Sequence, residues 1–310
     1  ELSATLLPCA LWTYLAGMVG AVLFQRAERL ANGIGFGLGA VGGFCGILAF
    51  ATALATGAAA VNQSFDLFPS LIPYVRFSIR ADALGCFFGL MVSLLAVAIS
   101  IYSLGYARGY YGHKNVGVLA AFFNLLLLAT TLVFLADNAF FFLVVWEIMA
   151  FCGYALVSFE HEKEESRSAG VLFFIMSHLG TGCLILGFLL LFQASGSHGF
   201  DSFHALGDQM PEGRRNLVFL LFLFGFGIKA LNSGASGGDA TLDFGASSLI
   251  NANYVYDAAH DNARVYGGVF ANNGGIAHGV DGKGLGRRQA AGKVEDAGAL
   301  GHLQDLADRR

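Results

Sequence analysis

The stretch Phe141-Phe-Leu-Val-Val-Trp-Glu-Ile-Met-Ala-Phe-Cys-Gly-Tyr154 decides the fold class of this chain. It is apolar except for one carboxylate, Glu147, and it lies within a longer run of the same character over 138–159. A helix needs about 20 mostly apolar residues to cross the hydrocarbon core of a bilayer. We therefore predict a membrane-spanning helix here, with Glu147 near the middle of the span.

Composition extends this interpretation to most of the chain. Of the 310 residues, 55% are hydrophobic and 13% are charged, whereas about 25% are charged in soluble domains. A net charge of -4 without a basic stripe excludes nucleic acid as the main partner. The five cysteines are far apart and form no CxxC or Cys/His motif, so the sequence indicates no metal site and no disulfide framework.

Together with 138–159, seven apolar runs are long enough, or nearly so, to span a membrane. The runs without a charge cover 4–24, 33–61, 83–107 and 116–136, and those with one ionisable residue cover 138–159, 168–195 and 216 to about 231. Because these runs are continuous rather than alternating, they favour helices over a β-barrel. We predict an all-α polytopic membrane bundle of six or seven spans.

Lysines and arginines in alternate loops give a weak orientation. Arg26, Arg29, Arg108, Lys114, Lys163 and Arg167 fall on one side, and Arg76, Arg80, Arg214 and Arg215 fall on the other. The side with more basic residues is normally cytoplasmic, which places the N-terminus outside.

A glycine-rich run inside the second span has two interpretations. The run from Gly33 to Gly43 contains a formal GxGxxG motif, which is typical of a dinucleotide-binding loop when it follows a strand. Here no strand precedes it, and Gly35, Gly39 and Gly43 recur at a spacing of four, which places them on one helix face. We interpret this face as a site of close helix packing.

Three ionisable residues lie at membrane depth: Glu147, Lys229 and His178. An acid and a base buried together change each other's proton affinity, and an intramembrane ionisable residue is by default a candidate functional site. We therefore predict a proton relay of Glu147 and Lys229, with His178 as a further step. The alternatives are a static ion pair, a lysine that reaches the interface, and a histidine that bonds two helices.

Other charged residues lie where helices are expected to end. Asp82 and Asp137 are predicted at helix mouths, where they would serve as an entrance or as structural support. The acidic run 160–167 reads as a solvated loop between two spans, and its charge would gather protons or cations.

From about Arg80 to Ala230 the chain resembles the antiporter-like membrane subunits of respiratory complex I, multisubunit sodium/proton antiporters and membrane-bound hydrogenases. The motifs are Asp82-Ala-Leu, Ala136-Asp-Asn, Trp146-Glu147 and Gly227-Ile-Lys229-Ala230. The longer N-terminus and the residues around Trp146 and Lys229 are most similar to the hydrogenase-4 component B type, also called the formate hydrogenlyase subunit 3 type.

The resemblance implies the first half of an antiporter-like fold, in which Glu147 pairs with Lys229 and His178 lies near a position that often carries a basic residue. Such subunits move protons or sodium, coupled to electron transfer in other subunits, and bind no redox cofactor. The chain would then be a non-redox subunit of an oxidoreductase complex in the bacterial inner membrane, with other membrane and peripheral subunits as partners. A sodium/proton antiporter subunit and a truncated, non-transporting scaffold are the alternatives.

The sequence changes character after Ala230. The family would continue with Pro-Leu-His, a broken helix and a second inverted half, whereas here a Gly/Ala-rich segment without Pro, Trp or Cys follows. We expect three parts: N-terminal helices and a loop over 1–80, an incomplete translocation core over 81–230, and a tail over 231–310. We interpret the tail as disordered or out of frame rather than as a soluble domain.

The tail interpretation is tested by the gene sequence across the codons for Phe219 to Ser236, together with the mass of the protein isolated from membranes. We expect a shift of one or two bases that restores a long apolar continuation after Lys229. If DNA and mass both support 310 residues, the scaffold interpretation takes precedence.

Overall fold

The computed structural model describes residues 2–56, 62–66, 76–206, 209–234, 254–257 and 262–265. For 2–4, 62–66, 76, 165, 229–234 and the two strands beyond 250, it describes the backbone alone. The chain divides into two compact units, Glu1–Phe159 with His178–Phe226, and Glu160–Ser177 with Gly227–Arg310. Each unit is described by itself below.

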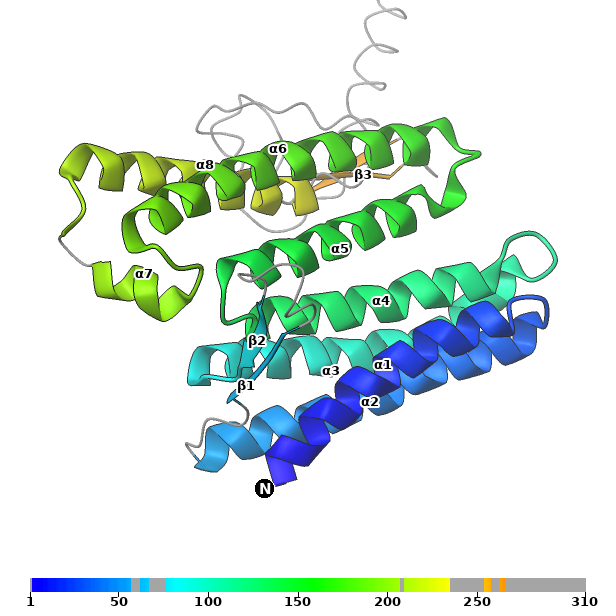
Figure 1. Cartoon of the computed structure of the whole chain (residues 1–310). Coiled ribbons are helices and arrows are strands. Elements are labelled where there is room, and N and C mark those ends of the chain that lie inside the picture. Colours follow the sequence, from blue (N-terminus) through cyan, green and yellow to red (C-terminus); the bar gives the residue numbers. More distant parts are fainter. Residues whose placement is uncertain are drawn as a thin grey trace, which may run out of the picture. The chain divides into compact units, whose positions relative to one another are not determined.

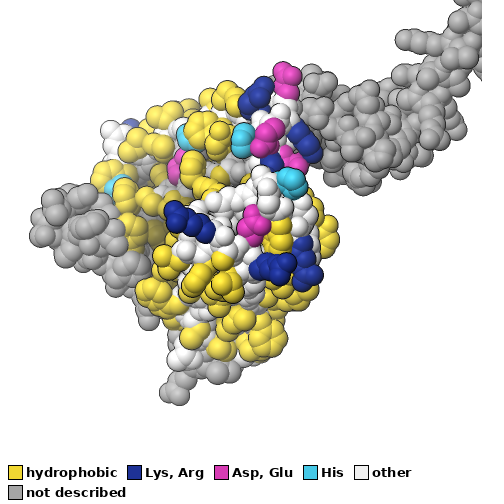
Figure 2. Space-filling model, turned by 90° about the vertical axis from the view of Figure 1, so that its right-hand side faces the viewer, with side chains coloured by type: hydrophobic (Ala, Val, Ile, Leu, Met, Phe, Trp, Pro, Cys, Tyr) yellow, Lys and Arg dark blue, Asp and Glu magenta, His cyan; other side chains and the backbone are white. Residues whose placement is uncertain are grey.

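The described membrane part is helical, as predicted (Figure 1). Its long helices are α1 Leu2–Leu23, α2 Glu28–Thr56, α3 Ala83–Tyr106, α4 Val116–Leu135, α5 Ala139–Val157, α6 Glu164–Ser195 and α8 Glu212–Gly234. Within the described residues, six helical segments are long and apolar enough to cross a membrane. The first lies within α1 and the sixth within α6, and the four between them cover α2 to α5. The chain is thus a multi-pass membrane protein. Much of its described surface is hydrophobic, as lipid-facing helices require (Figure 2).

Helices α1 to α4 pack on one another, with α2 in contact with α1, α3 and α4. The predicted glycine face of α2 makes this possible. A Cβ built on Gly35 would lie 2.6 Å from Cβ of Ala120, and one on Gly43 would lie 3.0 Å from the backbone oxygen of Ser93. The packing interpretation of the glycine run is therefore confirmed, since the glycines let neighbouring helices approach closely.

Polar side chains within this bundle donate hydrogen bonds to nearby backbone carbonyls. Asn124 is fully buried on α4, and its Nδ2 donates to the carbonyls of Gly35 and Ala120 at 2.9 and 2.8 Å. Thr131 donates to the carbonyl of Leu127 at 2.8 Å. Such bonds let polar residues lie inside a membrane bundle without water.

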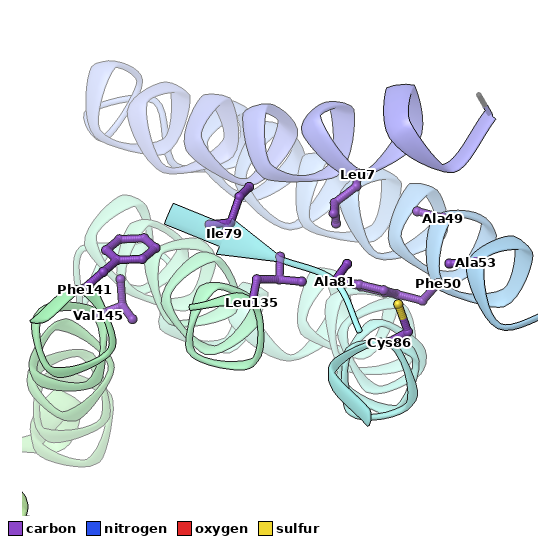
Figure 3. Packing of buried hydrophobic residues seen from close by; sticks show 10 residues of the cluster. All are labelled: Leu7, Ala49, Phe50, Ala53, Ile79, Ala81, Cys86, Leu135, Phe141 and Val145. Atoms are coloured by element: carbon purple, nitrogen blue, oxygen red, sulfur yellow. The ribbon is translucent and has the colours of Figure 1, made fainter. Parts of the chain in front are cut away.

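A hydrophobic cluster closes one end of the bundle (Figure 3). It joins side chains from α1, α2, β2, α3, α4 and α5, namely Leu7, Ala49, Phe50, Ala53, Ile79, Ala81, Cys86, Leu135, Phe141 and Val145. The cluster therefore connects the bundle to α5, the helix that carries Glu147.

Several elements were not predicted from the sequence. Strands β1 Asn62–Asp66 and β2 Arg76–Arg80 form an antiparallel pair in which Ser64 lies opposite Ser78. Short helices follow α3, α5 and α6: η1 Ala107–Tyr110, η2 Ser158–Glu160 and α7 Phe200–Leu206. Beyond residue 250 the sequence does predict strand-like pieces, at 254–256 and 264–266, and β3 Tyr254–Asp257 pairs there antiparallel with β4 Asn262–Val265. The remaining predictions for the tail lie outside the described residues.

Two glycines of α2 provide a matched test of the packing. We expect Gly35→Ala to lower the free energy of unfolding by about 1–3 kcal/mol, because its Cβ would overlap that of Ala120. Gly37 has no atom within 4 Å of a built Cβ, so Gly37→Ala should be neutral or slightly stabilising. Denaturant unfolding of the purified protein in detergent measures both, and equal losses would contradict the packing role.

Candidate functional site

The site begins with α5, which holds Glu147 next to its middle residue, Ile148. Asn138 fixes the start of this helix, because its side-chain oxygen accepts the backbone N–H of Phe141 at 2.8 Å. Its amide also donates to Oγ of Ser78 at 2.7 Å, which ties the helix start to β2. The local sequence thus places a carboxylate at mid-span, as predicted.

His178 lies near the middle of α6 and meets Glu147 directly. The distance between Nε2 of His178 and Oε2 of Glu147 is 3.2 Å. Among the described residues, Oε1 of Glu147 has no hydrogen-bond partner. The Glu147 and His178 side chains remain 35% and 45% exposed, so the pair lies on an open face of its unit rather than in a sealed core.

Aromatic rings hold α5 against α6 and α8 beside this pair. The centroid of Phe142 lies 5.8 Å from that of Phe188 on α6, and the centroid of Trp146 lies 5.6 Å from that of Phe226 on α8. Phe188 also packs on Phe222 at 4.8 Å. Ring contacts of this kind add about 0.5–1.5 kcal/mol each beyond the burial of apolar area. They limit rotation of α5 and so keep Glu147 facing the same direction.

Lys229 lies on α8, whose backbone continues to Gly234. The position of its side chain is outside the described residues. The expected pairing of Glu147 with Lys229 therefore stays a prediction.

The two carboxylates predicted at helix mouths do lie there. Asp82 caps α3, since its Oδ1 accepts the N–H of Gly85 at 2.6 Å. Asp137 lies between α4 and α5 and is paired with Arg80, whose Nε is 3.0 Å from its Oδ1. Asp82 therefore supports the start of α3, and Asp137 lies just before the start of α5.

Arg80 joins Asp137 to a second carboxylate, Asp201, which lies in the first turn of α7. Its two terminal nitrogens donate to Asp201 at 2.6 and 2.9 Å. Burial raises the pKa of Asp137 despite the nearby guanidinium, because Asp137 is only 18% exposed. Hydrogen bonds from Arg80 lower the pKa of Asp201, which is 74% exposed and stays ionised. Arg80 thus forms ion pairs with one partly buried carboxylate, Asp137, and one exposed carboxylate, Asp201.

Sequence reasoning missed the roles of Arg80 and Asp201, and that of Asn138 as a helix cap. Arg80 and Asp201 are far apart in the chain, and no local motif links them. Asn138 carried a signal, because Asn followed by an apolar run is typical of a helix start.

The acidic segment 160–167 belongs to the second unit. Lys163 pairs with Glu160 at 2.9 Å, and His161, Glu162, Lys163 and Glu164 are exposed. The exposure of 161–164 agrees with a solvated segment, but the loop is shorter than predicted, because η2 ends at Glu160 and α6 already begins at Glu164. Among the described residues there is no group of three or more His, Cys, Asp or Glu side chains that could hold a metal ion.

Comparison with known proteins identifies the core of the chain. Residues 136–232 match the model of the family described as NADH:quinone oxidoreductase/Mrp antiporter, transmembrane. This segment of the chain is similar to that family. The matched segment contains Glu147, His178 and Lys229, the ionisable residues predicted at membrane depth.

One curated relative extends the match toward the N-terminus. The chain is 34% identical to hydrogenase-4 component B of Escherichia coli over 225 residues, which are 73% of this chain and 32% of the relative. The chain thus spans about a third of the length of this relative.

Two solved structures show the same fold. A chain of an archaeal membrane-bound sulfane sulfur reductase matches with a TM-score of 0.60 at 16% identity, over 76% of this chain and 48% of the other. A chain of the Mrp complex from Dietzia matches with a TM-score of 0.56 at 17% identity, over 73% and 23%. The fold is therefore that of antiporter-like subunits of multisubunit membrane complexes.

The cap of α5 can be tested by substitution. We expect Asn138→Ala to cost about 1 kcal/mol of unfolding free energy, because the N–H of Phe141 and the hydroxyl of Ser78 lose a partner. Asn138→Ser should retain most of the stability, since serine is also a good N-cap. Thermal unfolding in detergent compares the two, and equal melting temperatures for Asn138→Ala and wild type would contradict the role.

Proposed function

We propose that this chain is a proton-translocating membrane subunit of a hydrogenase or NADH dehydrogenase-like complex. Glu147, His178 and Lys229 form the relay, and electron transfer in partner subunits drives it. The observation that carries the proposal is the contact between Glu147 and His178 at the middle of α5 and α6.

The position of this contact favours transport over a packing role. A charged side chain at the bilayer centre costs about 2.5–3.5 kcal/mol even on insertion scales. A packing role needs no such residues, because Asn124 already bonds two helices inside the bundle. Oε1 of Glu147 is buried without a hydrogen-bond partner among the described residues, whereas the two side chains as a whole are partly exposed. The buried oxygen can therefore accept a proton or a hydrogen bond from a further group, and the exposed part of the pair gives a proton a way in.

Histidine and carboxylate suit this exchange chemically. Imidazole takes up and releases a proton near neutral pH, and a neighbouring carboxylate stabilises its charged form. A relay needs partners whose separation changes their proton affinity, and a lysine supplies this when it is desolvated. Lys229 is the lysine of the family-matched segment on α8, which makes it the natural third member.

The assignment to a complex rests on the relatives. Hydrogenase-4 component B is a component of a hydrogenase by its name, and the sulfane sulfur reductase is a respiratory membrane complex. We infer that this chain likewise works with other membrane and peripheral subunits, in the bacterial inner membrane, as a non-redox subunit.

A sodium/proton antiporter subunit is the second candidate. The family description includes the Mrp antiporter, and the Mrp complex is one of the structural matches. Glutamate and histidine can serve either ion, so the ion must be measured. The same transport assay in sodium-free and sodium-containing buffer separates the two candidates.

The relay is tested in inside-out vesicles that contain the assembled complex. We expect Glu147→Gln, His178→Gln and Lys229→Ala each to lower the proton uptake rate per complex by about 10-fold or more, because each removes a proton-transfer group. Glu212→Gln and His204→Gln are matched controls, since both side chains are exposed on short or terminal helical turns. Wild-type rates in both Glu147→Gln and Lys229→Ala would reject the relay and favour a scaffold.

A further inference from the structure

Three segments far apart in the sequence meet at the start of α5. The N–H of Asp137 donates to the carbonyl of Ser78 at 3.0 Å, which joins β2 to the α4–α5 junction. On the other side, the N–H of Ala139 donates to the carbonyl of His198 at 2.9 Å, and Asn138 pairs with Gly199 as an isolated bridge. We call 78–82, 136–139 and 198–201 together the three-segment junction.

The junction also fixes the end of α6. Gly196 has a φ of 69°, and its N–H donates to the carbonyl of Phe192 at 2.8 Å, which ends the helix in a left-handed turn. The His198 ring then stacks on Phe192, with centroids 4.1 Å apart and an angle of 10°. The last turn of α6 is therefore linked through few residues to the first turn of α5.

The side chain of Arg80 connects the three segments of the junction through ion pairs. It comes from β2 and pairs with Asp137 of the α4–α5 junction and with Asp201 of α7. Without it, the poorly exposed Asp137 would lose its cation and face a second carboxylate at close range. The ion pairs thus oppose separation of the three segments.

This link bears on the register of α5 against α6. Glu147 is about 14 Å along its helix from Asn138, at a rise of 1.5 Å per residue. A slide of α6 by one residue would move His178 by about 1.5 Å, which is enough to break a contact of 3.2 Å. Ring contacts such as Phe142 with Phe188 tolerate a slide better, because they are less directional.

We propose that Arg80 is a positioning residue for the relay. By holding Asp137 and Asp201 together, it sets the register in which Glu147 meets His178. The expected effect of Arg80 on transport rests on the proposed function. Its expected effect on the register of α5 and α6 does not.

The register is measured directly with spin labels at Ile148 on α5 and Ile185 on α6. Both residues are exposed, at 37% and 41%, and both belong to the same compact unit. In a background without the five native cysteines, we expect a narrow distance distribution for the otherwise unchanged chain and a broadened or shifted one for Arg80→Gln. Arg80→Lys keeps the charge but not the forked contacts with both carboxylates, so we expect its distribution to lie between those two.

Proton uptake per assembled complex provides the second measurement. We expect Arg80→Gln to lower it about 10-fold, Arg80→Lys to keep about half or more, and Asp201→Asn to lie between them. In a His178→Gln background, Arg80→Gln should cause no further loss, because the contact it positions is already gone. Normalisation to assembled complex removes any effect on the amount of folded protein.

The outcomes separate the two proposals. An unchanged distance distribution in Arg80→Gln overturns the positioning role, whatever the transport rates are. If Glu147→Gln is inactive while Arg80→Gln transports at the wild-type rate per complex, the relay stands and the positioning role falls. If Glu147→Gln transports normally but the distances shift in Arg80→Gln, the relay falls and Arg80 keeps only its effect on register.

Discussion

The interaction on which this structure depends is the contact between a carboxylate and an imidazole at the middle of two apolar helices. A contact of 3.2 Å between Glu147 and His178 requires α5 and α6 to keep their register within a fraction of a helical turn. Contacts within a single helix cannot fix the position of that helix relative to its neighbour. The surrounding helices, the aromatic rings beside Trp146 and the junction at the start of α5 all restrict the same two degrees of freedom, sliding and rotation.

The α1–α4 bundle supplies a rigid support without using charge. Its glycines bring backbones close together, and the amide of Asn124 and the hydroxyl of Thr131 donate to nearby carbonyls. In the described spans, charged residues other than the central pair lie near helix ends, as Glu28, Arg108 and Arg167 do. This division is physically sensible, because a charge at a helix end reaches the interface whereas a charge at mid-span does not. Asp, Glu, His, Lys and Arg side chains at mid-depth are thus confined, among the described spans, to the two residues that the proposed chemistry needs.

The spans can be predicted well from the sequence, because the bilayer requires apolar runs of a certain length and such runs are visible in a short stretch of sequence. The predicted run 83–107 agrees closely with α3 Ala83–Tyr106, and Glu147 lies at mid-helix as expected. The second predicted run starts five residues late, since Glu28 and Arg29 form a polar first turn that hydropathy does not count. The junction could not be predicted, because Arg80 and Asp201 meet only after the chain has folded. The acid Asp137 was recognised, but its cation was counted only as a loop charge.

The exposure of the central pair bears on what surrounds it in the membrane. At 35% and 45% exposed, Glu147 and His178 are too open to be covered by hydrocarbon at low cost. Their face must therefore meet water or polar groups of protein when the chain is in the bilayer. A scaffold would gain nothing from such a face, since an apolar pair would pack α5 on α6 equally well and without the desolvation cost. A transport route needs this arrangement, because a proton can leave the pair only if something polar stands beside it. The partial exposure of the pair is thus itself an argument for translocation over packing.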